Sequence, residues 1–236
     1  MKAELNCDMG EGIGNDELIM PYITSANIAC GYHAGNEETM KHTILLAKKY
    51  NVHIGAHPSF LDTENFGRTE MNLSAEEVYG LVFKQIKVLQ KIADENMVNL
   101  HHIKPHGALY NMAAKEKVLA KAIAHAVKDI DETSILYGLS NSFLISEAKA
   151  LGLKTASEVF ADRTYQDNGN LTPRSQPNAL IENVDDAVEQ VLMMVKQQKV
   201  RTVSGKEIPI VAETICIHGD GKNAVEFAKI ISQILQ

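Results

Sequence analysis

The chain alternates short, mainly apolar runs with longer runs in which apolar residues recur at helical spacing. Seven short runs favour strands, because they are rich in apolar and β-branched residues and are bounded by turn residues. These are Ala3–Asp8, Ala26–Gly31, Val52–His57, Asn99–His106, Ser134–Leu139, Leu153–Phe160 and Ile210–His218. The helical runs are Glu37–Tyr50, Ser74–Asn96, Lys115–Lys128, Asn141–Leu151, Val184–Lys199 and Asn223–Leu235. The pattern therefore predicts a series of βα units.

Two local signals add detail to this pattern. Ser74 and Glu77 have the spacing of a capping box at the start of the longest helical run. The segment Arg201–Pro209 has turn residues at Ser204-Gly205 and predicts a small hairpin before the last strand.

Alternating βα units imply a parallel sheet with helices outside it. No Pro/Gly/Ser-rich linker interrupts the chain, so we expect a single domain over residues 1–236. The sheet is either open and doubly wound or closed into a barrel of seven units. We favour the seven-stranded (β/α) barrel, because chemically reactive residues follow nearly every strand, whereas an open sheet gathers them at one switch point.

Composition narrows the function classes. The 236 residues include 23 Lys+Arg and 30 Asp+Glu, a formal net charge of −7. This acidic balance argues against nucleic acid as a partner, which needs a basic surface. No apolar run approaches the length of a membrane span or of a signal peptide's core, so we expect a cytoplasmic protein without a membrane partner. Cys7, Cys30 and Cys216 are too few and too dispersed for a disulfide framework and are expected to be reduced.

The nine histidines are the first sign of chemistry. Four of them lie beside Gly or Pro at the ends of predicted strands, namely His33, His57, His106 and His218. A single histidine in such a position is often structural, but four in equivalent positions favour one shared site. The carboxyl ends of the strands meet at the mouth of a barrel, so these histidines are expected to surround one cavity.

Strand alternation extends this candidate site inward. Asn6 and Asp8 share one face of the first strand, and His102, Lys104 and His106 share one face of the fourth. Lys104 is expected either to pair with a carboxylate inside the barrel or to bind an anionic substrate. The full set predicted around the cavity comprises Asp8, Glu11, His33, His57, Lys104, His106, His218 and Asp220.

Two polar segments could cover the cavity. Ser157–Leu180 carries Asp162, Arg163 and Arg174, and arginine forks there suit a carboxylate or a phosphate. The segment from Pro58 to Glu70 is a second candidate lid. The alternative for both is a solvated loop with surface ion pairs.

A metal centre is one of two interpretations of the histidines. His and Asp side chains suit zinc or another divalent ion, and the candidate ligands are Asp8, His33 and His57. No HExxH motif is present, and dispersed histidines serve equally well as general acids and bases near neutral pH. The chain also has no Walker A motif and no G-x-G-x-x-G, so the ordinary nucleotide-binding loops are missing.

Six blocks of sequence resemble a known family. They are ELNCDMGE, NIACGYHAGN, GAHPSF with FGRT, IKPHGALYN, SEVFADRTY with LTPRSQPNALI, and ICIHGD. In this order they resemble the LamB/YcsF family, the A component of prokaryotic ATP-dependent 5-oxoprolinase, over essentially the whole chain. The sequence differs from the family's usual residues at Asn36, where Asp is usual, and at Thr69, where a second Arg is common.

The resemblance implies an enzyme that opens the lactam of 5-oxo-L-proline to L-glutamate with hydrolysis of ATP. ATP would be a co-substrate, with Mg²⁺ accompanying it, and the partners would be subunits B and C. It also implies a seven-stranded barrel of the glycoside hydrolase/deacetylase type. The catalytic candidates are Asp8, Glu11, His33, His57, His106 and His218. The candidates for binding substrate or phosphate are Asn6, Lys104, Asp162, Arg163, Arg174 and Asp220.

In the resulting hypothesis ATP activates the lactam carbonyl, Asp8 or His57 acts as the base toward water, and His106 or His218 protonates the leaving nitrogen. Two other functions fit the same residues. One is a stand-alone, metal-dependent deacetylase or amidohydrolase acting on an N-acetylated or sugar-like substrate. The other is a metabolite-binding barrel without catalysis, although the number of titratable groups exceeds what binding alone needs.

Overall fold

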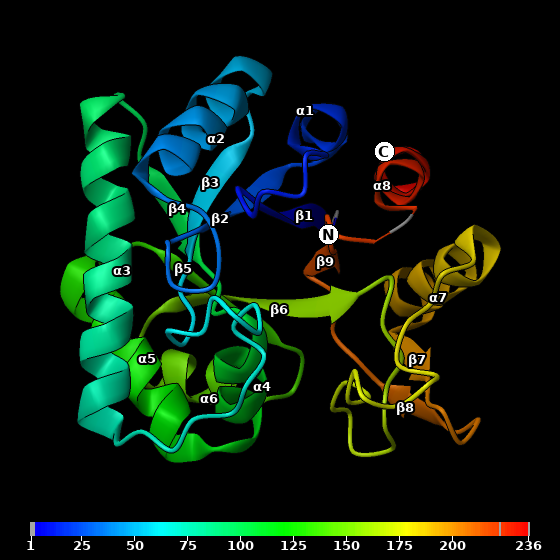
Figure 1. The fold of residues 1–236 in the computed structure, drawn as a ribbon. Helices are drawn as coiled ribbons and strands as arrows, with labels where there is room; N and C mark the ends of the chain where they lie inside the picture. The colour runs from blue at the N-terminus through cyan, green and yellow to red at the C-terminus, as the bar shows by residue number, and fades with distance from the viewer. Residues whose placement is uncertain (1–2, 222, 236) are drawn as a thin grey trace.

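The computed structural model describes residues 3–221 and 223–235. Seven parallel strands form a closed barrel in the order β1 (Glu4–Met9), β2 (Ser25–Ala29), β3 (His53–His57), β4 (Leu100–Ile103), β5 (Ile135–Leu139), β6 (Lys154–Phe160) and β9 (Thr214–Ile217). The first strand pairs with the last, with Leu5 opposite Ile215, and this pairing closes the barrel. The seven-stranded barrel expected from the sequence is confirmed (Figure 1).

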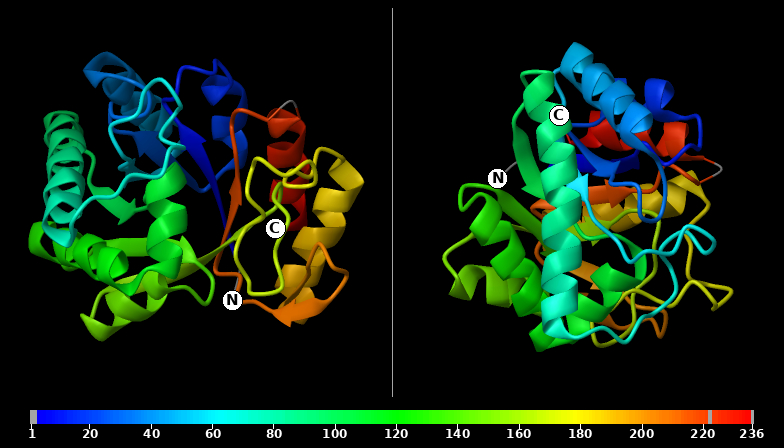
Figure 2. Two further views of the ribbon diagram at one scale, coloured as in Figure 1. Left: turned by 60° about the horizontal axis from the view of Figure 1, so that its bottom comes forward. Right: turned by 60° about the vertical axis from the view of Figure 1, so that its left-hand side comes forward.

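Helices form a layer around the strands, as the two further views show (Figure 2). The longer ones are α2 (Glu37–Tyr50), α3 (Ala75–Glu95), α4 (Gly107–Lys115), α5 (Lys117–Ile130), α6 (Phe143–Ala150), α7 (Val184–Gln197) and α8 (Ala224–Ile234). A short helix α1 (Asp16–Ile19) and the 3₁₀ turn η1 (Met20–Tyr22) follow β1. Across residues 3–221 and 223–235, none of the helices has the length and apolarity that a membrane span requires.

Local sequence fixes where the two best defined helices begin. Ser74 and Glu77 form the expected capping box at α3, each side chain bonding to the other's backbone N–H. Asn36 caps α2, where its side chain accepts a hydrogen bond from the Thr39 N–H. Asn36, the first departure from the family pattern, therefore has a structural role that an uncharged amide performs well.

Helix α4 was not expected from the sequence. Only Glu116 separates it from α5, and Lys115, the predicted start of the next helical run, is in fact the last residue of α4. The preceding strand β4 is also shorter than predicted, since it ends at Ile103. Pro105, which has no N–H, follows within two residues and cannot continue the ladder of hydrogen bonds.

The predicted hairpin is present and lies outside the barrel (Figure 1). Its strands β7 (Lys199–Arg201) and β8 (Glu207–Pro209) pair antiparallel around a turn with Gly205 at φ +86°. The hairpin begins two residues earlier than expected, so α7 ends at Gln197 rather than at Lys199. The barrel strand β9 begins only at Thr214, because the preceding residues connect the hairpin to the barrel.

Below its mouth the barrel contains hydrogen-bonded polar side chains. Asn27 donates to Asn6 Oδ1 and to Asp8 Oδ1, at 2.8 and 2.9 Å, and accepts a hydrogen bond from His102 Nε2 at 2.7 Å. Gly55 makes room for this arrangement, since a Cβ at that position would collide with the His102 ring. These buried groups support Asp8 from below.

Candidate active site

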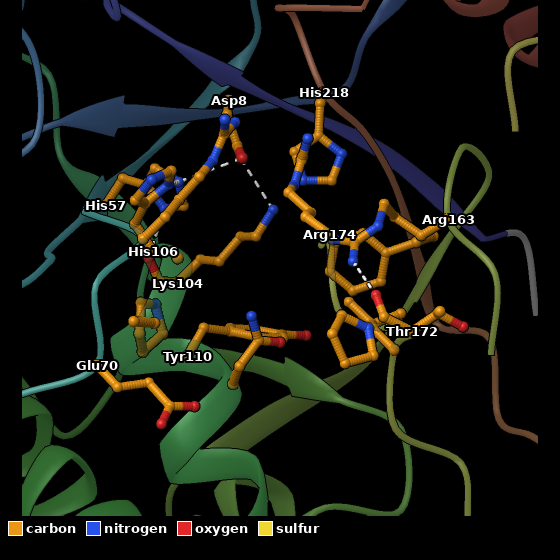
Figure 3. A pocket seen from close by; sticks show the side chains of 18 of the residues that line it. Asp8, His57, Glu70, Lys104, His106, Tyr110, Arg163, Thr172, Arg174 and His218 are labelled. Carbon is orange, nitrogen blue, oxygen red and sulfur yellow. Dashed lines mark hydrogen bonds and ion pairs between the residues drawn. The ribbon is translucent and has the colours of Figure 1, made fainter. Parts of the chain in front are cut away.

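A cavity of about 360 Å³ opens at the carboxyl ends of the barrel strands, a volume within the usual range for small-molecule sites. The loop after β3 and the loop after β6 lie at this end of the barrel and contribute to its wall (Figure 2). Seven predicted site residues line it: Asp8, His57, Lys104, His106, Arg163, Arg174 and His218. Asp8, His57 and His106 lie on one side, and Arg163 and Arg174 on the other (Figure 3).

Asp8 and Lys104 form a buried ion pair, with Lys104 Nζ at 2.9 Å from Asp8 Oδ1. Asp8 Oδ2 lies 3.3 Å from His57 Nε2. Burial tends to raise the pKa of Asp8, but the charges of His57 and Lys104 outweigh it and hold that pKa well below its usual range. Asp8 is therefore an anion at neutral pH and a weak base.

Lys104 has a second carboxylate partner, Glu158, whose Oε1 lies 3.0 Å from Nζ. Tyr110 donates to the other Glu158 oxygen at 2.6 Å. Burial tends to lower the pKa of Lys104, but Asp8, Cys216 and Glu158 together raise it well above its usual value. The expected pairing of Lys104 with a carboxylate inside the barrel is confirmed, and its contact with a substrate stays a prediction.

His57 and His106 contact each other through ring nitrogens, with His57 Nε2 at 2.9 Å from His106 Nδ1. His57 Nδ1 lies 2.7 Å from the carbonyl oxygen of Lys104, and His106 Nε2 lies 2.9 Å from that of Phe66. Burial, reinforced by the neighbouring rings of His33 and His57, lowers the pKa of His106 well below its usual value.

Glu11 and His33 lie behind these two histidines and do not line the cavity. Glu11 Oε1 is 3.1 Å from His33 Nε2, and the His33 ring stacks on His106 with centroids 3.8 Å apart. Burial and the charge of Asp8 raise the pKa of Glu11 well above its usual value. Burial and the charge of His57 lower the pKa of His33 to about 3. Any catalytic role of Glu11 or His33 would therefore act through His57 or His106.

His218 forms a separate pair with Asp162. Its Nδ1 lies 2.9 Å from Asp162 Oδ2, which also accepts the backbone N–H of His218 at 2.9 Å. Burial tends to raise the pKa of Asp162, but the charge and hydrogen bonds of His218 lower it. An ionised Asp162 fixes the His218 tautomer with Nδ1 protonated and leaves Nε2 for proton transfer.

The two arginines of the first candidate lid differ in their surroundings. Arg163 is buried and donates to the carbonyl oxygens of Ala179 and Thr172, at 3.2 and 2.6 Å, so it holds separate parts of this loop together. Burial and the charge of Arg174 lower its pKa to about 10. Arg174 is half-buried and borders the cavity.

The remaining predicted residues lie near the cavity but not in its wall. Asn6 is buried below Asp8 and donates to Thr214 Oγ1 at 2.8 Å. Asp162 and Asp220 line an adjoining cavity. Asp220 also forms an ion pair with Arg68 at 2.7 Å, which joins the loop after β3 to the loop after β9.

Several lining residues were not predicted as site residues. They are Arg68, Glu70, Tyr110, Asn111, Lys115, Phe160 and Thr172. Tyr110 and Asn111 follow His106 in the block IKPHGALYN, and recognition of α4 as a helix would have placed both one turn from that histidine. Arg68 could have been inferred from its place in the second candidate lid.

Among residues 3–221 and 223–235, two groups of side chains could hold a metal ion, because their ligand atoms lie within 4.8 Å of one another. One comprises Glu11, His33, His57 and His106, and the other comprises Asp8, Cys216 and His218. The three predicted metal candidates are therefore divided, with His33 and His57 in the first group and Asp8 in the second.

Comparison with known proteins agrees with the sequence blocks. Residues 3–236 match the model of the LamB/YcsF family. The chain is 54% identical to the A component of 5-oxoprolinase from Staphylococcus saprophyticus, over 100% of this chain and 95% of that protein. It is 53% identical to the A component of 5-oxoprolinase from Oceanobacillus iheyensis, over 100% of this chain and 93% of that protein.

Solved structures share the fold of this chain. A crystal structure of a lactam utilization protein from Thermus thermophilus superposes with a TM-score of 0.91 at 41% identity, covering 100% of this chain and 96% of that one. A putative cellobiose-phosphate cleavage protein of Enterococcus faecalis, with a TM-score of 0.55, 14% identity and coverage of 98% and 90%, shares the fold alone. From the family match and the identity to its relatives, the chain belongs to the LamB/YcsF family.

Proposed function

We propose that this chain is the lactam-opening A component of an ATP-dependent 5-oxoprolinase. The observation that carries the proposal is the cavity lined by His218, which is paired with Asp162 behind it, by the Asp8–Lys104 pair and by Arg174. Relatives at 50–54% identity that are named as this component of 5-oxoprolinase support the same activity. We further propose that residues 1–236 act as one domain, because the barrel is closed by pairing β1 with β9.

The reaction needs ATP because an amide carbonyl is weakly electrophilic. Transfer of the γ-phosphoryl group to the lactam oxygen releases ADP and makes the ring carbon electrophilic. Water then adds to this carbon, the C–N bond breaks as the nitrogen takes a proton, and γ-glutamyl phosphate forms. A second water hydrolyses that acyl phosphate to glutamate and phosphate. The net reaction converts 5-oxo-L-proline, ATP and two waters to L-glutamate, ADP and phosphate.

His218 is the group best suited to move the protons. Asp162 holds its Nδ1–H, so Nε2 can accept a proton from water and return it to the leaving nitrogen. Asp8, whose pKa is well below the usual range, is less suited as a base than the sequence suggested. Its charge, balanced by Lys104, would instead orient the attacking water or the lactam N–H.

The substrate carboxylate needs a cation, and the cavity wall provides several. Arg68, Lys115 and Arg174 line the cavity together with the buried Lys104 and Arg163. Arg174 is the proposed carboxylate ligand, because Lys104 and Arg163 already have buried partners in the chain. A protein with a net charge of −7 can therefore bind an anion at this cavity.

The phosphoryl step is assigned to a complex with subunits B and C. The chain has no Walker A motif and no G-x-G-x-x-G to hold ATP by itself. In this proposal ATP, with the Mg²⁺ that accompanies it, is bound with the help of those subunits, and the activated lactam reacts in the cavity of this chain.

The test measures glutamate release from 5-oxo-L-proline with ATP, by the purified chain alone and by the chain co-expressed with subunits B and C. We expect one phosphate per glutamate from the complex and no turnover by the chain alone. Absence of ATP-dependent glutamate from the complex would refute the function. Full turnover by the chain alone would refute only the division of labour. An N-acetylated sugar without ATP serves as the assay for the deacetylase alternative.

A further inference from the structure

One ring nitrogen in each of three histidines donates a hydrogen bond to a neighbouring oxygen. We call these the outer nitrogens; they are His33 Nδ1, His57 Nδ1 and His106 Nε2. A carbonyl oxygen can only accept, so His57 Nδ1 must carry the proton that faces the Lys104 carbonyl. By the same reasoning His106 Nε2 carries the proton that faces the Phe66 carbonyl. Because the hydroxyl of Ser59 donates to the Phe60 carbonyl, its oxygen accepts from His33 Nδ1.

When these three rings are neutral, their inner nitrogens present lone pairs, and the inner nitrogens converge. His57 Nε2 lies 2.9 Å from His106 Nδ1, so two lone pairs face each other. His33 Nε2 lies 3.1 Å from Glu11 Oε1, another acceptor when ionised. Glu11 Oε1 is also 3.7 Å from His106 Nδ1 and 4.0 Å from His57 Nε2. The four ligand atoms thus lie within 4.8 Å of one another, and with the rings neutral and Glu11 ionised none of the four carries a proton.

Acceptors at such distances repel one another unless a proton or a metal ion lies between them, and one metal ion would satisfy all four at once. We propose that Glu11, His33, His57 and His106 bind one divalent metal ion of the zinc class. Zinc at about 2.0–2.1 Å from four tetrahedral ligands separates them by about 3.3 Å. The four separations given above, from 2.9 to 4.0 Å, bracket that value, and no pair of the four atoms is more than 4.8 Å apart.

The chemistry of the four metal-binding groups also indicates the kind of ion. Three imidazoles and one carboxylate suit Zn²⁺, Co²⁺ or a similar transition metal, whereas Mg²⁺ and Ca²⁺ prefer oxygen ligands. The hydrogen bonds from the outer nitrogens to carbonyl and hydroxyl oxygens are those that orient metal-binding histidines in general. His57 and His106 also line the cavity, so the ion would adjoin the proposed lactam site.

Cobalt is the probe that tests the proposal. The purified chain is stripped with a chelator, checked for native circular dichroism, and titrated with Co²⁺ while its visible spectrum is recorded. We expect one equivalent of Co²⁺, ligand-field bands of a nitrogen- and oxygen-bound ion, and displacement by one equivalent of Zn²⁺. A thiolate-to-cobalt band would instead locate the ion at Asp8, Cys216 and His218 and overturn the proposal.

Variants identify the ligands. H33Q and H106Q should abolish the stoichiometric spectrum, and the exposed His42→Gln should keep it. Because removal of a buried ring can disturb folding, Glu11→Gln, which keeps the volume, provides a second measurement and should weaken Co²⁺ binding at least about tenfold. Failure of the native chain to bind Co²⁺ or Zn²⁺, or full binding by folded H33Q and H106Q, would overturn the proposal.

The metal site and the proposed 5-oxoprolinase function can be refuted independently of each other. Metal binding is read from the spectrum of the isolated chain, which needs neither ATP nor subunits B and C. A chain that binds the ion but releases no glutamate within the complex would refute only the function. A complex that turns over 5-oxoproline while its stripped chain binds no metal would refute only the metal site.

Discussion

Lys104 Nζ lies 2.9 Å from Asp8 Oδ1 inside the barrel, where the two side chains are 2% and 4% exposed. The same ammonium lies 3.0 Å from Glu158, whose side chain is fully buried. One cation therefore balances two carboxylates that are largely shielded from bulk water. Removal of a partner from a buried pair is costly, because the remaining charge loses its compensation.

We expect Lys104→Met to lower the free energy of unfolding by about 3–5 kcal/mol. Asp8→Asn should cost less, because Lys104 keeps Glu158 and the new amide keeps a similar shape. Urea unfolding followed by circular dichroism measures both. The control is Lys117→Met, whose side chain is 66% exposed and pairs with Glu147 at 3.5 Å; it should change stability by no more than about 1 kcal/mol. Equal effects of Lys104→Met and Lys117→Met would contradict the importance of the buried pair.

The position of His106 depends on a backbone contact with Gly67. Gly67 has φ +67°, and a Cβ there would lie 2.9 Å from both His106 Cδ2 and His33 Cβ. Gly67→Ala should therefore cost about 1–3 kcal/mol and displace the Phe66 carbonyl from His106. The matched control is Gly80→Ala in α3, where nothing lies within 4 Å, and it should add about 0.5–1 kcal/mol of stability. Thermal unfolding distinguishes them, and a neutral Gly67→Ala would refute this packing argument.

The pair of Asp162 and His218 predicts a dependence of stability on pH. The pKa of Asp162 is lower in the folded chain than in the unfolded one, so the unfolded chain binds more protons in acid. The resulting stabilisation is present above the unfolded pKa of about 3.9 and is lost as the pH falls through the folded pKa. Asp162→Asn should remove this component and flatten the stability curve as the pH falls from about 5 through the folded pKa of Asp162. Parallel curves for the two proteins would contradict the assignment.

Asp162→Asn should also lower kcat of the reconstituted enzyme by about 10²–10⁴-fold, because an amide no longer stabilises the protonated His218 ring. KM for 5-oxoproline should change little, since Asp162 does not line the main cavity. Steady-state glutamate release by the complex measures both constants. The neighbouring Asp167→Asn, an exposed aspartate bonded to Thr202 and Ser204, is the control. A large rise in KM with unchanged kcat would assign Asp162 to binding instead.

Sequence patterns predicted the barrel and the histidines at its mouth, because both follow from local periodicity and from the geometry of parallel strands. His57 is the last residue of β3, and His33, His106 and His218 follow strands, so the closed sheet had to bring all four to one end. Tight pairs between distant elements were not predictable in the same way. The hydrogen bond of Tyr110 to Glu158 joins α4 to β6, and no local pattern specifies where these two elements lie relative to each other.

Local pattern also could not separate groups that touch the cavity from those that lie behind it. Asn6 and Asp8 share a face of β1, yet Asp8 reaches the cavity and Asn6 bonds to Thr214 one layer below. Arg163 and Arg174 lie on one loop. The Arg163 guanidinium donates to backbone carbonyls, whereas the half-buried Arg174 borders the cavity. Depth within the barrel decides these differences, and depth is set by the register and tilt of the strands.

The two arginines of that loop allow binding to be separated from folding. Arg163→Ala should destabilise the chain, because its guanidinium satisfies the carbonyls of Ala179 and Thr172 in a buried position. Arg174→Ala removes a half-buried cation from the cavity wall and should leave the unfolding midpoint close to that of the native chain. Its effect should fall on the substrate, since a charged hydrogen bond to a carboxylate contributes about 1.5–3 kcal/mol.

We therefore expect Arg174→Ala to raise KM for 5-oxoproline about 10–100-fold with a smaller change in kcat, and Arg174→Lys to recover part of the loss. Glutamate release by the reconstituted complex over a range of substrate concentrations measures this split, and the exposed Arg201→Ala serves as the control. If Arg174→Ala left KM unchanged while a folded Arg68→Ala raised it, the substrate carboxylate would bind on the side of the loop after β3. Because Arg68 also pairs with Asp220, that result would make the contact between the two loops part of substrate binding.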